Sequence, residues 1–332
     1  MIVVTGGTGL IGAHLLVKLL ETNNSVTAIY RTENKISLTK RVFEYHNKLH
    51  LFSKIIWKKA DILDINSLEI VFENATQIYH CAAFISFKPQ HRDNLFKTNI
   101  EGTANVVNVA LYKKIEKVCY VSSVAALGDS INNMPITEET DWNYNSLKND
   151  YAISKHEAEM EVWRAYYEGL PMIIVNPGVI YGYGFTTGSS ATFSSVYKGM
   201  PFYTKGNLPV VAVEDVVTIM VQLMNSNIVA ERYTLVAENI SVKNLLQTIA
   251  LALNAKEPKF YLNKFTTNIL WRADAFFSFF GKKRVFSKSV SNSLHMKDLY
   301  SNEKIIKEMG VTFKSMKPYI SQMAKENIKL FG

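Results

Sequence analysis

Tyr151 and Lys155 are the residues whose types and spacing point most directly to acid–base chemistry. They lie four positions apart in a segment with the composition of a helix start, so both side chains should project from one helical face. A lone phenol titrates near pH ~10 and is a poor base at neutral pH. A nearby ammonium favours the phenolate and lowers its pKa, which would let Tyr151 exchange a proton with a substrate oxygen. Such pairs also occur by chance on solvated helices, so the pair needs support from other residues.

Two serines end a strand-like run upstream of this pair. Residues 118–121 are apolar and rich in strand-forming types, and they lead into Ser122 and Ser123. In a parallel sheet, the carboxyl end of such a strand lies where ligands bind. A serine at this place can meet a substrate; the alternative for Ser122 is a strand hydroxyl satisfied by backbone.

A glycine turn near the N-terminus would position a cofactor for these residues. The short strand at 2–5 runs into Gly6-Gly7-Thr8-Gly9-Leu10-Ile11-Gly12, and apolar residues then recur at helical spacing over 13–21. Strand, glycines and helix in this order suit a dinucleotide, because glycine permits a sharp turn close to a pyrophosphate and the helix start offers free N–H groups. The glycine spacing is G-x-x-G-x-x-G rather than G-x-G-x-x-G.

Strand-like and helical segments alternate through the first half of the chain. Further strands are predicted at 25–30, 55–59, 77–81, 118–122 and 172–176, and helices at 67–72, 93–113 and 150–168. This alternation predicts an α/β fold built on a doubly wound parallel sheet with helices on both faces. We expect a dinucleotide-binding domain at 1–176 and a smaller, mainly helical substrate-binding and C-terminal part at 177–332, some segments of which return to the first domain.

Composition and charge narrow the class of protein. The 332 residues are 48% hydrophobic and 20% charged, as in ordinary globular proteins. The net charge is +8, and residues 243–332 hold 16 Lys and Arg against 6 Asp and Glu. We interpret this excess as a solvated surface, with an anionic substrate group or an anionic membrane surface as alternatives. Nucleic acid is not an expected partner, because no recognised binding motif accompanies the charge.

Cysteine usage and hydropathy indicate a cytoplasmic protein. Cys81 and Cys119 both lie in apolar, strand-like runs and are expected to be buried free thiols in a reducing compartment. No apolar run reaches 18 residues, and a strand that begins at the first residues leaves no room for a signal peptide. No cluster of His, Cys and carboxylates has metal-ligand spacing, so no metal is expected.

Together these motifs resemble the short-chain dehydrogenase/reductase superfamily, and the chain length resembles its extended branch, the NAD-dependent epimerase/dehydratase family. That branch typically shows T-G-x-x-G-x-x-G, a strand-end serine and Y-x-x-x-K, and this chain matches all three. The resemblance covers essentially the whole chain and implies a Rossmann fold with a nicotinamide cofactor. Within the branch, the chain looks closest to the dihydroflavonol-reductase-like and 3β-hydroxysteroid-dehydrogenase-like members.

The resemblance also implies residue roles. Tyr151 would be the general acid/base, Lys155 would tune it and hold the nicotinamide ribose, and Ser123 would hydrogen-bond the substrate carbonyl or hydroxyl. Asn99 would be the catalytic-site asparagine of the family, although a helix asparagine can simply bond its own backbone. The implied cofactor contacts are Gly6, Thr8, Gly9, Leu10, Ile11, Gly12, Arg31, Asp61, Ile62, Ala82, Ala83, Tyr151, Lys155, Pro177 and Val179.

The end of the second strand bears on cofactor choice. NAD-selective relatives place an acid there for the ribose 2′-hydroxyl, whereas this chain has Tyr30 followed by Arg31. The charge and forked donors of an arginine suit a 2′-phosphate. We therefore expect NADP in preference to NAD, with Glu33 as the competing acid.

Local departures from the family pattern narrow the reaction. Dehydratases of the branch typically carry the sequence Thr-Asp-Glu at the end of the strand that here leads into Ser122 and Ser123. Residues 123–125 of this chain lack that pair of acids. Epimerases usually carry an asparagine where this chain has Val179. The later loops are instead rich in aromatic residues that suit an apolar carbonyl or alcohol, namely Phe185, Phe193, Tyr197, Phe202 and Tyr203. We expect a reductase or dehydrogenase of a small-molecule substrate, with a sugar-nucleotide epimerase and a non-enzymatic cofactor sensor as alternatives.

One late segment has the pattern of an amphipathic helix. Apolar residues recur at 265, 269, 273, 276 and 280, and the basic run 281–284 follows. Such a helix can lie on a membrane surface, but packing over the substrate pocket or across a dimer face is the favoured interpretation. A homodimer and a monomer both remain open.

Overall fold

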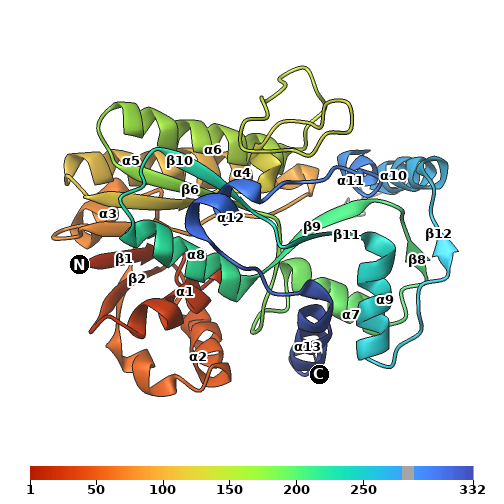
Figure 1. Ribbon diagram of the computed structural model, residues 1–332, viewed down its shortest axis with the longest axis horizontal. Helices are drawn as coiled ribbons and strands as arrows, with labels where there is room; N and C mark the ends of the chain where they lie inside the picture. The colour runs from red at the N-terminus through yellow and green to blue at the C-terminus, as the bar shows by residue number, and fades with distance from the viewer. Residues whose placement is uncertain (279–287, 332) are drawn as a thin grey trace.

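The computed structural model describes residues 1–278 and 288–331, and a seven-stranded parallel sheet lies at its centre (Figure 1). The strands lie in the spatial order β10-β6-β5-β4-β1-β2-β3. Their bounds are β1 (Ile2–Thr5), β2 (Val26–Tyr30), β3 (Ile55–Lys59), β4 (Gln77–His80), β5 (Lys117–Val121), β6 (Met172–Pro177) and β10 (Glu231–Leu235). The six strands predicted in the first half are confirmed, each end within one residue of its predicted place.

The strand order reverses between β1 and β4. The chain runs from β1 outward to β2 and β3, then crosses back so that β4 pairs with the other side of β1. Thr5, the last residue of β1, is in register with His80, the last residue of β4. The segments that follow these two strands therefore leave the sheet side by side, at the point where open α/β sheets bind ligands. We call the rim formed by the ends of β1, β4 and β5 the carboxyl edge.

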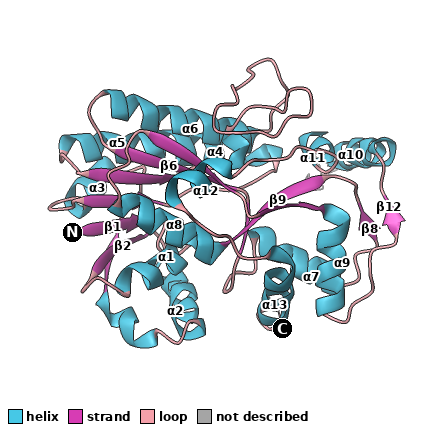
Figure 2. Ribbon diagram, in the orientation of Figure 1, coloured by secondary structure: helices cyan, strands magenta, loops and turns pink. Residues whose placement is uncertain are grey.

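Helices cover both faces of this sheet, as the alternating pattern predicts (Figure 2). One face packs against α1 (Leu10–Leu20), α2 (Ile36–Tyr45), α8 (Val213–Asn225) and α12 (Glu303–Met309). The other packs against α3 (Ile65–Val71), α5 (Gly102–Tyr112) and α6 (Asp150–Tyr167). The short α4 (Arg92–Phe96) continues through a π-helical turn, Lys97–Glu101, into α5. No helix was predicted at α2, because only Thr39, Val42 and Phe43 of that polar segment are buried.

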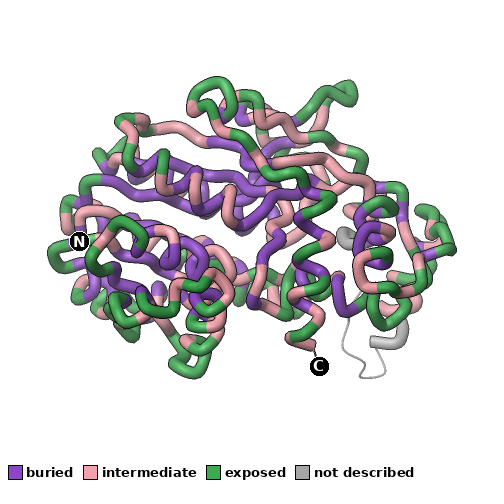
Figure 3. The backbone as a smooth tube through the Cα atoms, turned by 60° about the horizontal axis from the view of Figure 1, so that its bottom comes forward, coloured by how far each residue is buried: buried purple, intermediate pink, exposed green. Residues whose placement is uncertain are grey.

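The C-terminal part forms its own layer at the right of Figure 1. Its strands are β7 (Val179–Tyr181), β9 (Asn207–Ala212) and β11 (Glu238–Ser241) in one small sheet, and β8 (Phe202–Tyr203) and β12 (Phe260–Tyr261) in another. Its helices are α7 (Ala191–Tyr197), α9 (Val242–Ala252), α10 (Lys264–Ser278), α11 (Lys288–Ser293) and α13 (Met316–Ile328). A separate hydrophobic core joins α7, α9 and α13 to β9. Burial is concentrated in the strands and on the inner helix faces, and the exposed residues lie at the periphery of the molecule (Figure 3).

The predicted amphipathic segment forms α10. Phe265 and Ile269 on this helix are largely exposed. The side chains at 276 and 280 and the basic run 281–284 lie outside the described part of the chain. Among the described helices, none has the length and hydrophobicity needed to cross a bilayer. Cys119 is a buried free thiol, as expected, whereas the free thiol of Cys81 is only partly buried.

Candidate active site

The glycine turn, residues 6–12, connects β1 to α1 at the carboxyl edge. Gly6 has a φ of +69°, a conformation that favours glycine, and a Cβ at this residue would lie 2.7 Å from the backbone nitrogen of Ala82. A Cβ on Gly12 would lie 2.2 Å from the carbonyl oxygen of Gly6. The backbone of this turn is thus packed against itself and against the segment after β4, with no space for side chains at either position.

This geometry fits the phosphates of a dinucleotide. Gly9 is the N-cap residue of α1 and places no side chain over the first helical turn, which contains Leu10 and Ile11. The first N–H groups of a helix have no partner within it, and the positive end of its dipole attracts anions. Thr8, in the middle of the turn, is partly exposed. The predicted residues of the turn therefore lie together at the N-terminal end of α1.

The residues predicted to meet the adenosine end lie at the ends of β2 and β3. Arg31 directly follows β2, and its Nη1 lies 3.9 Å from Oδ2 of Asp61. The Arg31 side chain is 63% exposed, so it is accessible to a phosphate. Ile62 is buried in the core with its side chain packed under Gly102, so only its backbone can face a ligand. Ala83, after β4, is exposed.

Lys155 is buried in the second turn of α6. Its Nζ donates to the hydroxyl of Tyr120 and to the carbonyl oxygen of Val121, both at 2.8 Å, and lies 4.4 Å from the centroid of the Tyr120 ring. Burial lowers the pKa of Lys155 from its usual 10.5 to about 7, against opposing effects of Glu159 and Cys81. Near pH 7, Lys155 is therefore present in both its protonated and its neutral form.

A buried chain of polar groups connects Lys155 with β1. The Thr5 hydroxyl lies 2.7 Å from Nδ1 of His80, and Nε2 of His80 lies 3.1 Å from the Thr103 hydroxyl. Thr103 in turn hydrogen-bonds Tyr120, the partner of Lys155. Burial lowers the pKa of His80 to about 3, so this imidazole is neutral. Sequence reasoning missed this chain, since threonines in strands and helices carry no signal of their own.

Tyr151 lies at the start of α6, next to Ser123. Burial raises the pKa of Tyr151, and a hydrogen bond from the Ser123 hydroxyl acts in the opposite direction. The expectation that Lys155 lowers this pKa is wrong for this structure, because the ammonium is held by Tyr120 and Val121 instead. The ring of Phe87, in the segment after β4, lies edge-on to Tyr151 with centroids 5.5 Å apart.

The two strand-end serines have different partners. The Ser123 hydroxyl caps the short 3₁₀ turn Val124–Ala126 by accepting from the N–H of Ala125 at 3.1 Å. The Ser122 hydroxyl donates to Oε2 of Glu159 at 2.5 Å. Ser122 is therefore satisfied by a buried carboxylate and not by backbone, and Ser123 is the serine on the Tyr151 side.

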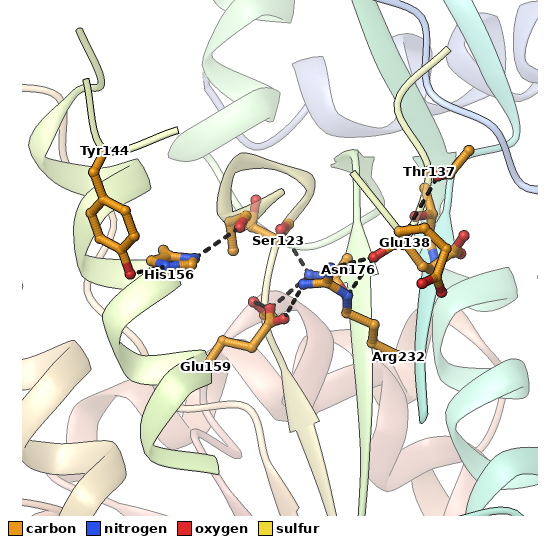
Figure 4. Close-up of polar contacts among 12 residues, drawn as sticks. Ser123, Thr137, Glu138, Tyr144, His156, Glu159, Asn176 and Arg232 are labelled. Atoms are coloured by element: carbon orange, nitrogen blue, oxygen red, sulfur yellow. Dashed lines mark hydrogen bonds and ion pairs between the residues drawn. The ribbon is translucent and has the colours of Figure 1, made fainter. Parts of the chain in front are cut away.

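Glu159 is the centre of a buried polar network beneath Ser123 (Figure 4). Its carboxylate pairs with Nη1 of Arg232 at 3.0 Å and accepts from Nδ2 of Asn176 at 2.8 Å. Asn176 also donates to the Ser123 carbonyl oxygen at 3.1 Å. The network joins α6, β5, β6 and β10, so it fixes the position of the strand end that carries the serines.

The same network anchors the long loop between β5 and α6. Arg232 donates to the Glu138 carbonyl oxygen, and the Glu138 carboxylate accepts from the N–H of Thr234 at 2.6 Å (Figure 4). On the α6 side, the His156 ring stacks on Trp142 with centroids 4.0 Å apart. The loop that precedes Tyr151 is thus held at two places.

Asn99 braces two neighbouring segments. Its side-chain oxygen accepts from the N–H of Phe84 at 2.7 Å, and its Nδ2 donates to the Phe84 carbonyl oxygen and to the Ser154 hydroxyl. Its backbone lies in the π-helical turn before α5, a feature often found at functional sites. The alternative that Asn99 bonds its own backbone is wrong. It connects the segment after β4 to α6 and so fixes Phe87 and Tyr151 relative to one another.

The aromatic residues of the later loops do not share one environment. Phe193 is fully buried against Tyr181, with centroids 5.5 Å apart, and Tyr203 packs on the same C-terminal core. Tyr197 and Phe202 are exposed. The expectation that these aromatic residues serve an apolar substrate is therefore wrong for Phe193, because its ring fills the core.

Two further predicted cofactor contacts lie at the end of β6. Pro177 ends β6, and Val179 begins β7 in register with Val210. Gly178 between them donates its N–H to the carbonyl oxygen of Leu235 at 3.1 Å. This junction couples the main sheet to the small C-terminal sheet.

Comparisons with known proteins agree with this architecture. The family model described as the NAD-dependent epimerase/dehydratase family matches residues 2–235. A putative dihydroflavonol 4-reductase from Synechocystis sp. is 28% identical over 263 residues, which cover 77% of this chain and 73% of that protein. A UDP-glucose 4-epimerase from Vibrio cholerae is 23% identical over 267 residues, which cover 76% of each. The solved structure of gox2253 has the same fold, with a TM-score of 0.82 at 24% identity over 100% of this chain and 97% of that one.

Proposed function

Because this chain belongs to the NAD-dependent epimerase/dehydratase family, we propose that it is a reductase or dehydrogenase of a small or medium apolar carbonyl or alcohol, with NADP preferred over NAD. The observation that carries the proposal is the convergence of Ser123, Tyr151 and buried Lys155 at the carboxyl edge. The glycine turn lies at the same edge, and the Thr5–His80 contact links the two.

Each residue of this cluster has a distinct task. The nicotinamide cofactor supplies or accepts the hydride when it is bound. The Tyr151 hydroxyl gives a proton to the substrate oxygen or removes one from it, and the Ser123 hydroxyl orients that oxygen. Lys155, which is held by the Tyr120 hydroxyl and the Val121 carbonyl oxygen, would contact the nicotinamide ribose. Asn99 is a positioning residue, because its hydrogen bonds to Phe84 and Ser154 hold the segment after β4 against α6.

The surroundings of Tyr151 support an apolar substrate. Ile85 and Phe87, in the segment after β4, are 62% and 51% exposed, and the Phe87 ring lies against Tyr151. Exposed apolar side chains beside a proton donor suit a substrate with an aromatic or aliphatic body. The similarity to a protein named as a putative dihydroflavonol 4-reductase supports the same class.

A sugar-nucleotide epimerase is the second candidate. It is favoured by the similarity to the UDP-glucose 4-epimerase, which extends over as much of the chain as the similarity to the reductase. Against it, Val179 stands at the place where epimerases grip the diphosphate with an asparagine. The loops between 183 and 209 offer only Lys198 and Lys205 as cations for a diphosphate, and Lys205 lies over the Tyr261 ring with Nζ 4.6 Å from its centroid.

Hydride transfer can be tested directly with labelled cofactor. NADPH deuterated at the nicotinamide C4 is incubated with the protein and a panel of aromatic and alicyclic aldehydes and ketones. We expect deuterium at the new carbinol carbon of at least one product, detected by mass spectrometry. Interconversion of UDP-sugars without reduction of any carbonyl would contradict the proposal in favour of the epimerase.

Cofactor preference has a separate test at Arg31. NADPH should raise the unfolding temperature more than NADH at equal concentration, because only the 2′-phosphate meets the exposed guanidinium. Arg31→Ser should reduce the NADPH shift and leave the NADH shift nearly unchanged. Equal shifts with both cofactors in the wild-type protein would show that Arg31 does not select NADP.

A further inference from the structure

Three side chains that can ligate a metal ion come together one helical turn beyond the glycine turn. His14 lies on α1, His46 directly follows α2, and Glu214 lies in the first turn of α8. One ligand atom from each lies within 4.8 Å of the other two. The three residues are far apart in sequence, so spacing along the chain does not reveal them.

The two histidines face each other through ring nitrogens. Nε2 of His46 lies 3.0 Å from Nδ1 of His14, with the rings nearly perpendicular at 88°. Nε2 of His14 lies 3.0 Å from the carbonyl oxygen of Tyr183. Because a carbonyl oxygen only accepts, this nitrogen carries the proton, and Nδ1 of His14 accepts a hydrogen bond from Nε2–H of His46. A metal ion would take the place of that proton, with His46 in its other neutral tautomer. A tetrahedral zinc ion with Zn–N bonds of about 2.0–2.1 Å would hold two such nitrogens about 3.3 Å apart. The observed pair is only a few tenths of an ångström too close.

The groups around these ligands match the outer shell of known metal sites. Metal-bound histidines usually donate their second N–H to a carbonyl or carboxylate, and ligating carboxylates are themselves hydrogen-bonded. His14 already has its carbonyl partner in Tyr183. The Tyr319 hydroxyl on α13 donates to Oε2 of Glu214 at 2.6 Å. Both the imidazole and the carboxylate are thereby oriented before any ion arrives.

Charged groups of both signs surround the two histidines. Among the carboxylates, Glu214 has the largest electrostatic effect on each histidine, and Glu21 also acts electrostatically on His46. Lys48 and Lys314 oppose them at His46. Glu214 and Glu21 thus balance Lys48 and Lys314 in charge, and Glu214 is the one carboxylate among the three proposed ligands.

We propose that His14, His46 and Glu214 form a binding site for a divalent transition-metal ion, with Zn²⁺ as the best fit. Two imidazoles and a carboxylate are the donor set of three-ligand zinc sites that keep a fourth position open. Imidazole nitrogens disfavour Mg²⁺ and Ca²⁺, which take oxygen ligands. The ion would connect α1, α2 and α8 directly, and α13 through Tyr319.

The fourth coordination position can be reached from solvent. A surface pocket of about 780 Å³ is lined by Tyr45, His46, Glu214, Lys314, Tyr319 and Gln322. Water or a small anion could complete the coordination sphere from this side, where Lys314 supplies a positive charge. The site is independent of Ser123, Tyr151 and Lys155, so it stands or falls separately from the proposed reaction.

Metal titration of the full-length protein tests this site. Protein prepared without a polyhistidine tag and dialysed against a chelator should bind one equivalent of Zn²⁺ in a calorimetric titration, with an increase in unfolding temperature. Co²⁺ in its place should give the visible absorption bands of a four- or five-coordinate nitrogen and oxygen site. His46→Asn should weaken Zn²⁺ binding by at least about 100-fold, because loss of an outer-shell partner alone costs about 10- to 100-fold. Tyr319→Phe should weaken it by about tenfold.

His50→Asn is the matched control. His50 is an exposed histidine just beyond His46, and its loss should leave the Zn²⁺ affinity and the Co²⁺ spectrum unchanged. Zn²⁺ binding of undiminished affinity in His46→Asn would overturn the proposal, as would an equal loss in His50→Asn. If His46→Asn fails to fold, the wild-type protein decides: failure to bind Zn²⁺, or a Co²⁺ spectrum of an all-oxygen octahedral site, would also overturn it.

Discussion

On the β1 side of the carboxyl edge the protein offers backbone, whereas on the β5 side it offers side chains. The glycine turn has its shape because Gly6 and Gly12 carry no Cβ that would collide with neighbouring backbone. Ser123, by contrast, is held by a buried polar network centred on Glu159, and Lys155 is held by the Tyr120 hydroxyl and the Val121 carbonyl oxygen. The conformation of the β1 side thus depends on glycines that carry no side chain, and that of the β5 side depends on hydrogen bonds and an ion pair between side chains.

Substitutions on the two sides should therefore destabilise the protein in different ways. A substitution in the glycine turn creates a steric clash that is local, so its cost depends on the free space at that one position. A substitution in the polar network leaves the remaining buried groups without partners, so its cost is spread over several elements. Matched pairs of variants on each side can separate the two mechanisms.

Glu159→Gln should have the largest effect on stability. The change leaves the Arg232 guanidinium without its carboxylate in a mostly buried site, and breaking such a pair typically costs about 3–5 kcal/mol. Glu161→Gln, two residues along α6, removes a carboxylate that pairs with Arg164 at the surface and should cost less than about 1 kcal/mol. Chemical denaturation measures both, and equal effects would show that the network is not what stabilises the β5 side.

Gly12→Ala should have the next largest effect, on the β1 side. A Cβ at this position would lie 2.2 Å from the Gly6 carbonyl oxygen, whereas a Cβ on Gly9 would lie at an ordinary 3.4 Å. Overpacking of this kind costs about 1–3 kcal/mol, and the distorted turn should also lose the thermal shift given by NADPH. Gly9→Ala should keep the unfolding temperature of the free protein. A Gly12→Ala protein as stable as Gly9→Ala would refute the steric account.

Lys155 should give the most gradual effect, a dependence of stability on pH. Its pKa is lowered from 10.5 to about 7 on folding, so between these values the unfolded chain binds a proton that the folded chain does not. The free energy of unfolding should therefore rise with pH in this window, by at most about 1.4 kcal/mol per pH unit. The difference between wild type and Lys155→Met, measured from pH 7 to about pH 9 by denaturation, isolates this contribution. Parallel curves for the two proteins would contradict the lowered pKa.

The sequence predicts the parts of the site that depend on local pattern. The glycine turn and the ends of β1, β4 and β5 follow from spacing and strand propensity within about ten residues, and the structure confirms the strands within one residue. Of the two strand-end serines, Ser123 hydrogen-bonds Tyr151 and Ser122 donates to Glu159, whereas the catalytic role of Ser123 stays a prediction.

What the sequence could not show depends on long-range pairing and on burial. Glu159 and Arg232 are 73 residues apart, and nothing local marks them as partners. The ammonium of Lys155 binds Tyr120 instead of acting on Tyr151, which is a matter of packing between β5 and α6. Likewise, the aromatic content of the later loops cannot show that Phe193 fills a core. Composition gives the residue types, and only the tertiary structure decides which of them reach a ligand.

The turnover of Tyr151→Phe compared with Tyr167→Phe tests the central claim most directly. Both tyrosines lie on α6, but Tyr167 is 82% exposed at its far end. With a carbonyl substrate identified by deuterium transfer, Tyr151→Phe should lower kcat/KM by about 10²- to 10⁴-fold, because general acid–base catalysis contributes that much. It should still bind NADPH, as judged by thermal shift, and Tyr167→Phe should match the wild type in both measurements. Turnover of Tyr151→Phe close to that of the wild type would contradict the assignment of Tyr151 as the proton donor.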